Sequence, residues 1–211
     1  MITIARGHDL WRFPSSADKM FEDRRIQFKE RNKWNVHIDS DGYEVDQYDR
    51  LNPVYIIIHS SENPHCGSMR ILPLGKGTML MDYFSETVKG YSFKDKKIWE
   101  CTRFCVSKGQ GRSVALKLFA SGSAFLSYTG FSNFIAIFDK KMLRFYRAIG
   151  ISPKIIGVYS YLGEEVYSGL FNCNQERYKK FLISGNIESS TITGAISRFH
   201  ERETYIYPKA A

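Results

Sequence analysis

Acidic and guanidinium side chains recur between apolar runs in the first half of this chain, at Glu44, Asp46, Asp49, Arg70, Glu100 and Arg103. A carboxylate in a low-dielectric sheet is costly unless it is paired, so charges at such positions are typical of a preorganised polar site. Glu100 lies in an apolar run, where a buried carboxylate can act as a general base. The alternative is that Glu100 only pairs with Arg103 to hold two strands together.

The length and composition limit the architecture that can hold these charges. With 211 residues and 43% hydrophobic content, the chain can bury one substantial core, and we expect a single domain over residues 1–211. The aromatic content of 15% fits either a large core or a pocket for an apolar ligand. Charged residues interrupt the first thirteen positions, and no later segment approaches a membrane span, which indicates a cytoplasmic protein.

The net charge and the cysteines restrict the partners. A charge of +8 favours an acidic partner, such as nucleic acid, anionic lipid or an acidic carrier protein. The four cysteines show no metal-ligand spacing, so we expect reduced structural thiols and no metal; they are Cys66, Cys101, Cys105 and Cys173.

The elements that position the charges can be read from periodicity and turn residues. Apolar residues at helical spacing predict a helix from Asp18 to about Arg31, with Ser15 or Ser16 as its N-cap. β-branched and aromatic runs predict strands at 54–59, 69–74, 98–106 and 134–138, the first two forming a hairpin. Later segments predict a helix over 113–128, a helix from Asp139 to Gly150, a hairpin of 159–162 with 166–171, and a last helix over 175–183. This order indicates an α/β fold with helices packed on a mixed sheet.

The spacing of Glu100 and Arg103 predicts a β-bulge in the strand over 98–106. Strict alternation would place two residues with an odd offset on opposite faces of the sheet. An extra residue restores a common face, and it frees a backbone N–H that can donate a hydrogen bond at an active site.

Ten positions share their types and spacing with one known family. They are Arg24, Phe28, Trp34, Glu44, Asp46, Asp49, Arg70, Phe84, Glu100 and Arg103, and the local phrases are Asp46-Gln47-Tyr48-Asp49, Ser68-Met69-Arg70-Ile71-Leu72-Pro73 and Trp99-Glu100-Cys101-Thr102-Arg103-Phe104. The chain resembles the acyl-homoserine-lactone synthases, the autoinducer synthases of bacterial quorum sensing, which are related to the GNAT acyltransferases. The resemblance implies a GNAT-like three-layer sandwich, a mixed twisted sheet with helices on both faces.

The resemblance also implies a reaction in two parts. The amine of S-adenosylmethionine, the co-substrate, attacks the thioester of an acylated carrier protein, and the methionine carboxylate then closes a lactone and releases methylthioadenosine. The resemblance implies no permanently bound cofactor. An α-amino group has a pKa of about 8, so a base must remove a proton before the attack, and we assign this role to Glu100.

The other site residues follow from the same resemblance. We expect Asp46, Asp49, Arg70 and Arg103 to form an ionic network that shapes the adenosylmethionine site. Arg24 and Phe28 are one helical turn apart, so the arginine can reach that network while the ring packs beneath it. We expect Trp34 to close over the ligand and Phe84 to contact it. The alternative is that Phe28, Trp34 and Phe84 are ordinary packing residues and Arg24 a surface charge.

The acyl donor should meet a basic surface and an apolar interior. Lys140, Arg144 and Arg147 align on one helix face, and Lys154, Lys179 and Lys180 add to it, so we expect an acidic acyl carrier protein to dock there. Acyl-CoA is the other possible donor, because the loop at Gln110 and Gly111 partly resembles the GNAT phosphate-binding pattern.

Candidates for contact with the acyl tail are Leu80, Phe104, Leu116, Phe119, Phe125, Phe134 and Leu143. Ala136 occupies a position where family members that make 3-oxo products often carry threonine, so we expect an unsubstituted chain.

Two other functions fit parts of the sequence. One is a GNAT N-acetyltransferase that uses acetyl-CoA, but Ser113 replaces the first glycine of the phosphate-binding pattern. The other is a basic nucleic-acid-binding module, which gives no reason for acids among the strands. We therefore expect a lactone synthase that does not act on nucleic acid.

Overall fold

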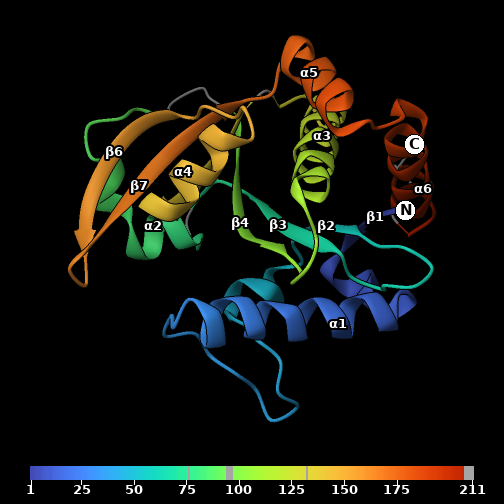
Figure 1. The fold of residues 1–211 in the computed structure, drawn as a ribbon, viewed down its shortest axis with the longest axis horizontal. Coiled ribbons are helices and arrows are strands. Elements are labelled where there is room, and N and C mark those ends of the chain that lie inside the picture. The colour runs from blue at the N-terminus through green and yellow to red at the C-terminus, as the bar shows by residue number, and fades with distance from the viewer. Residues whose placement is uncertain (76, 94–96, 132, 207–211) are drawn as a thin grey trace.

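The computed structural model describes residues 1–75, 77–93, 97–131 and 133–206. These residues form one seven-stranded sheet in the order β1-β2-β3-β4-β5-β7-β6 (Figure 1). The strands are β1 Ile2–Arg6, β2 Val54–Ile58, β3 Gly67–Pro73, β4 Ile98–Val106, β5 Asn133–Asp139, β6 Lys154–Tyr161 and β7 Glu164–Asn172. All neighbours pair antiparallel except β4 and β5, which are parallel.

The parallel pair opens shortly after it begins. β4 and β5 pair only from Ile98 with Asn133 to Glu100 with Ile135, so the rest of β4 has no strand partner on that side in this register. Glu100 is therefore the last residue of β4 before the two strands separate.

Helices cover both faces of the sheet. The helices are α1 Pro14–Arg24, continued by the π-helical segment η2 Arg25–Arg31, then α2 Met79–Tyr83, α3 Arg112–Tyr128, α4 Lys140–Ala148, α5 Gln175–Gly185 and α6 Ser189–Ile206. Three short 3-10 segments are η1 Gly7–Arg12, η3 Gln47–Leu51 and η4 Ser85–Val88. Figure 1 shows α1 on one side of the sheet and α3, α5 and α6 on the other. The expected mixed α/β sandwich is confirmed.

The entirely apolar sequence of β2 explains why helices cover both faces of the sheet. Val54, Ile56 and Ile58 belong to the main core with α3, whereas Tyr55 and Ile57 pack against Met20 of α1. Because successive strand residues point to opposite faces, an entirely apolar strand needs a helix layer on each side.

The structure corrects two local predictions and adds a strand that the sequence did not indicate. Neither serine caps α1, because the N-cap is Phe13 and the helix starts at Pro14, which suits the first helical position. The helix over 175–183 is not the last one, since α6 follows it, and the edge strand β1 was not predicted. The predicted hairpins β2–β3 and β6–β7 are confirmed, as is Asp139, which caps α4 by accepting a hydrogen bond from the Met142 N–H at 2.7 Å.

Candidate active site

Arg24 anchors an ionic network between α1 and the segment that leads into β2. Its side chain has no exposed surface. Arg24 Nε donates to Glu44 at 2.6 Å, and its two terminal nitrogens donate to Asp49 at 3.1 and 2.9 Å. The Tyr55 hydroxyl also donates to Asp49. The paired geometry fixes the guanidinium plane, which a single contact would leave free to rotate.

Arg70 and Arg103 complete the network from β3 and β4. Arg70 donates to Asp46 at 2.5 and 2.9 Å and to Asp49 at 2.7 Å. Arg103 Nη2 lies 2.8 Å from an oxygen of Glu44 and 2.8 Å from an oxygen of Asp46. The three guanidiniums are thus matched by three carboxylates. The expected network of Asp46, Asp49, Arg70 and Arg103 is present, Arg24 reaches it as predicted, and Glu44 joins it.

The charges of the network shift the pKa values of Arg24 and Asp49 so that both stay ionised despite burial. Burial alone would lower the pKa of Arg24, but the carboxylates of Glu44 and Asp49 outweigh it and raise that pKa above its usual range. Burial acts to raise the pKa of Asp49, and the charges of Arg24 and Arg70 outweigh it and hold that pKa well below its usual range. The cluster is therefore a fixed set of charges around which a zwitterionic substrate can be oriented.

The predicted bulge is present in β4 and brings the site residues to one face. Ser68 pairs with Cys105 and Arg70 with Thr102, so Met69 lies opposite both Arg103 and Phe104. Arg103 has φ of +52°, a left-handed conformation that is unfavourable for a residue other than glycine. Thr102 accepts a hydrogen bond from Arg70 at 2.9 Å, so adjacent Thr102 and Arg103 both face the network.

Glu100 is buried on the same face and does not pair with Arg103. Its two carboxylate oxygens accept hydrogen bonds from the backbone N–H groups of Met79 at 3.1 Å and Leu80 at 2.6 Å, at the start of α2. Burial raises the pKa of Glu100 to about 7, against the opposing effect of these N–H groups. A carboxyl with that pKa can exchange protons with an amine near neutral pH.

Two aromatic rings lie over the network at its exposed edge. Phe28 stacks on Trp34 with centroids 5.3 Å apart, and the Arg103 guanidinium lies 5.6 Å from the Phe28 centroid. Trp34 is 40% exposed, so the stacked pair extends from the cluster to the surface. The ring centroids of Phe84 and of Tyr161 in the β6–β7 hairpin lie 5.1 Å apart. Ala136 is buried in the main core.

The predicted acyl-tail residues separate into two groups. Six of them belong to the main core on the α3 side: Phe104, Leu116, Phe119, Phe125, Phe134 and Leu143. Leu80 instead belongs to a smaller core on the other face with Val88, Ile98 and Ile135. Leu80 therefore lies on the Glu100 side of the sheet, apart from the other six candidates.

The basic face of α4 has the predicted orientation. Lys140, Arg144 and Arg147 are exposed, whereas Leu143, Tyr146 and Ile149 are buried. Lys154, Lys179 and Lys180 are also exposed. Arg177 of α5 donates to the Ser152 carbonyl at 3.4 Å, and a small cavity of about 190 Å³ lies between residues 150–152 and α5. The basic residues of α4 therefore adjoin those of α5.

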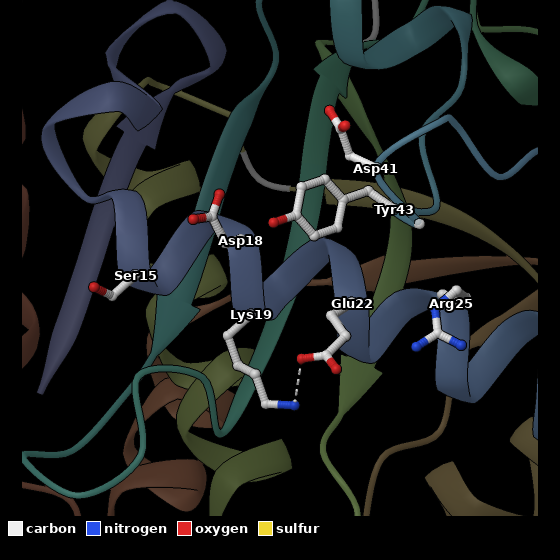
Figure 2. A pocket seen from close by; sticks show the side chains of 8 residues that line it. Ser15, Asp18, Lys19, Glu22, Arg25, Asp41 and Tyr43 are labelled. Atoms are coloured by element: carbon white, nitrogen blue, oxygen red, sulfur yellow. Dashed lines mark hydrogen bonds and ion pairs between the residues drawn. The ribbon is translucent and has the colours of Figure 1, made fainter.

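A larger cavity of about 450 Å³ lies elsewhere, along the outer face of α1. Figure 2 shows its lining side chains on the helix and on the loop that ends at Tyr43. The lining residues of α1 are Ser15, Asp18, Lys19 and Glu22, and Arg25 at the start of η2 continues the same face. Met20 and Arg24 point to the interior instead, so this cavity is separate from the ionic network.

Sequence reasoning missed several polar partners of the site. Glu44 was placed in the charge cluster without a role, yet it bridges Arg24 and Arg103. Tyr48, Tyr55 and Thr102 have no role in the prediction from sequence, and only their spacing to Asp46, Asp49 and Arg70 could have indicated one. Within the part of the chain that the structure describes, no cluster of His, Cys, Asp and Glu could hold a metal, and no helix is long and apolar enough to cross a membrane. The four cysteines are free and buried, and burial raises the pKa of Cys105 to about 12.

The architecture is that of the GNAT-like acyltransferases. A putative N-acetyltransferase from Lactobacillus plantarum matches with a TM-score of 0.55 at 14% identity, covering 82% of this chain and 99% of the other. A CoA-dependent acyl-homoserine lactone synthase, BjaI, solved with SAM and isopentyl-CoA, matches with a TM-score of 0.77 at 19% identity, covering 89% and 90%. These similarities establish the fold.

The family follows from the sequence comparison. An acyl-homoserine-lactone synthase of Rhizobium etli is 34% identical in an alignment of 149 positions that covers 64% of this chain and 67% of the relative. The profile of the autoinducer synthase family matches residues 10–181. The chain belongs to the autoinducer synthase family and is an acyltransferase of the acyl-homoserine-lactone synthase class.

Proposed function

We propose that residues 1–211 act as one cytoplasmic domain that transfers an acyl chain from a carrier thioester to the amine of S-adenosylmethionine and then closes the lactone. The observation that supports this most directly is the buried Glu100, with a pKa raised to about 7, beside a fixed ionic network. The network offers oriented charge to a zwitterionic amino acid, and Glu100 offers a proton acceptor.

The acyl transfer needs a neutral amine and a polarised thioester. Glu100, directly or through one water, takes the proton from the substrate ammonium, and the free amine attacks the thioester carbon. The carrier thiolate leaves and takes up a proton. The open edge of β4 beyond Glu100 and the bulge at Arg103 present backbone groups where a thioester and its amide-containing arm can bind.

Lactone closure depends on the folding of the substrate. A carboxylate oxygen of the acylated methionine attacks the γ-carbon, and the carbon–sulfur bond breaks to release neutral methylthioadenosine. The nucleophile and the electrophile belong to one molecule, so correct positioning supplies most of the acceleration. We assign this positioning to Arg24, Arg70 and Arg103 with their carboxylates, and the cover over the ligand to Phe28, Trp34 and Phe84.

The donor is proposed to be an acyl carrier protein that docks on α4. The exposed Lys140, Arg144 and Arg147 form a positive stripe that adjoins Lys154 and Lys180, and such a surface gives an acidic partner orientation and a faster association rate. Acyl-CoA is the alternative donor, because the N-terminus of α3 at Gly111 has no side-chain cap and can bind a phosphate.

The test is turnover with purified protein. The protein is mixed with S-adenosylmethionine and with acyl thioesters of several chain lengths, on carrier protein in one series and on CoA in another. We expect methylthioadenosine and an N-acyl-homoserine lactone in equal amounts, detected by mass spectrometry, with faster turnover in the carrier series. No turnover with any donor would refute the proposal.

A further inference from the structure

A second buried polar cluster, which the proposed reaction does not use, lies on α1 immediately before Arg24. Asp23 meets His65, which precedes β3, and Ser107, which follows β4. His65 Nδ1 lies 2.7 Å from Asp23 Oδ2, and the Ser107 hydroxyl donates to the same oxygen at 2.6 Å. All three residues are buried, and His65 has no exposed surface.

The geometry excludes a serine–histidine relay. In such a relay the two imidazole nitrogens contact the acid and the serine separately. Here Ser107 Oγ and Asp23 both approach Nδ1, at 3.0 and 2.7 Å, and Nε2 of His65 is buried without a partner among the described residues. The cluster therefore lacks the arrangement that activates a serine nucleophile.

The protonation of the cluster fits an anchor. Burial acts to raise the pKa of Asp23, but the hydrogen bonds from His65, Lys19 and Ser107 outweigh it and lower that pKa to about 2. Burial lowers the pKa of His65. The pair is therefore a carboxylate and a neutral imidazole with its proton on Nδ1, and Lys19 of the same helix donates to the second carboxylate oxygen at 2.8 Å.

A buried carboxylate is a poor way to stabilise a helix, since apolar contacts would do so at lower cost, and its usual benefit is a defined register. Apart from Arg24, α1 packs inward through apolar contacts such as Met20 against Tyr55 and Ile57. Such contacts permit sliding and rotation of the helix. Asp23 bonds to fixed points beside two strands, and the next residue is the fully buried Arg24.

We propose that Asp23, His65 and Ser107 are positioning residues for adenosylmethionine: they fix the last turn of α1 so that Arg24 meets Glu44 and Asp49 in the geometry that binds the substrate. This inference rests on the proposed function. The ligand that it concerns is S-adenosylmethionine. Binding of the acyl thioester should be unaffected, because the cluster touches α1, β3 and β4 on the side of the ionic network.

The test compares two variants of nearly equal shape. His65→Leu removes the N–H that donates to Asp23, and His65→Asn restores an N–H close to the position of Nδ1. We expect His65→Leu to lower kcat/KM for adenosylmethionine by about 10- to 100-fold, the order expected when a binding group is misplaced by about 1 Å. The KM for the acyl thioester should stay within about twofold, and His65→Asn should recover most of the loss.

Controls separate positioning from general destabilisation. Ser107→Ala removes the hydroxyl that donates to Asp23 and serves if His65→Leu does not fold. Ser121→Ala removes a buried serine hydrogen bond to the Lys117 carbonyl inside α3 and should leave kcat/KM unchanged. If folded Ser107→Ala or His65→Leu has the wild-type kcat/KM for adenosylmethionine, or matches Ser121→Ala, the inference is wrong. If wild-type protein makes no lactone and binds no adenosylmethionine, the proposed function fails and this inference fails with it.

Discussion

Replacement of Glu100 by glutamine tests the buried carboxyl in both stability and catalysis. The two oxygens of Glu100 accept from the Met79 and Leu80 N–H groups, whereas glutamine has one oxygen and directs an NH₂ group at the second N–H. That unsatisfied contact costs about 1–3 kcal/mol at every pH. The removal of a titrating group adds an effect that depends on pH.

The pH-dependent part can be calculated. The pKa of Glu100 is raised from 4.5 to about 7, so the native state holds a proton that the unfolded state releases. The contribution of Glu100 to stability is fully present below pH 4.5 and is lost as the pH rises through 7. Since one pKa unit corresponds to about 1.4 kcal/mol, wild type should lose about 3 kcal/mol relative to Glu100→Gln across this range.

The assay is urea unfolding of both proteins at pH 5 and pH 8. We expect the stability advantage of wild type at pH 5 to shrink or reverse at pH 8. In the same buffers, kcat/KM for the acyl thioester should fall by about 10²- to 10⁴-fold in the variant, because a general base is lost. A stability difference that is independent of pH, together with activity within tenfold of wild type, would refute both the shifted pKa and the catalytic role.

Three further predictions test the fold, the carrier surface and the acyl site. Gly157→Ala should lower the free energy of unfolding by at least about 2 kcal/mol in urea titrations, because a Cβ would lie 1.4 Å from the Thr87 carbonyl oxygen, whereas Gly75→Ala, with open space around its Cβ, should have little effect. Equal stability of the two alanine variants would contradict the packing of η4 on β6. Lys140→Glu with Arg144→Glu should lower kcat/KM for the carrier-bound thioester by about tenfold at low salt and leave acyl-CoA turnover unchanged, with Lys89→Glu as the control. An equal loss with both donors would argue against docking on α4. Ala136→Thr should raise the ratio of 3-oxo to unsubstituted product by about 2- to 10-fold in mass spectra, the effect of one hydrogen bond, and Ala136→Val should not. The same ratio in both variants would exclude contact between residue 136 and the acyl chain.

Sequence alone predicted the features that follow from strict geometric rules. The odd offset of Glu100 and Arg103 required a bulge, because strand alternation allows no other way to bring them to one face, and the bulge is present. The charge cluster at Asp46, Asp49 and Arg70 was likewise predictable, since buried charges must find partners.

Features that depend on backbone partners could not be read in the same way. The pairing of Glu100 with the N–H groups of α2 leaves no signal in side-chain types, so Arg103 is the partner that the sequence offers as the alternative to a catalytic role. The strand β1 is short and runs directly into the polar segment η1, which hides its alternation. His65 and Ser107 lie far apart in the chain, and only the register of β3 and β4 brings them to Asp23.

The central claim is that Glu100 and the ionic network together orient the amino acid part of adenosylmethionine for attack. A crystal structure of the protein with S-adenosylmethionine tests this claim most directly. We predict that the substrate amine lies within hydrogen-bond reach of Glu100, directly or through one water, with its carboxylate close to Arg24, Arg70 or Arg103. An amine bound remote from Glu100, for example in the cavity on the outer face of α1 in Figure 2, would contradict the account.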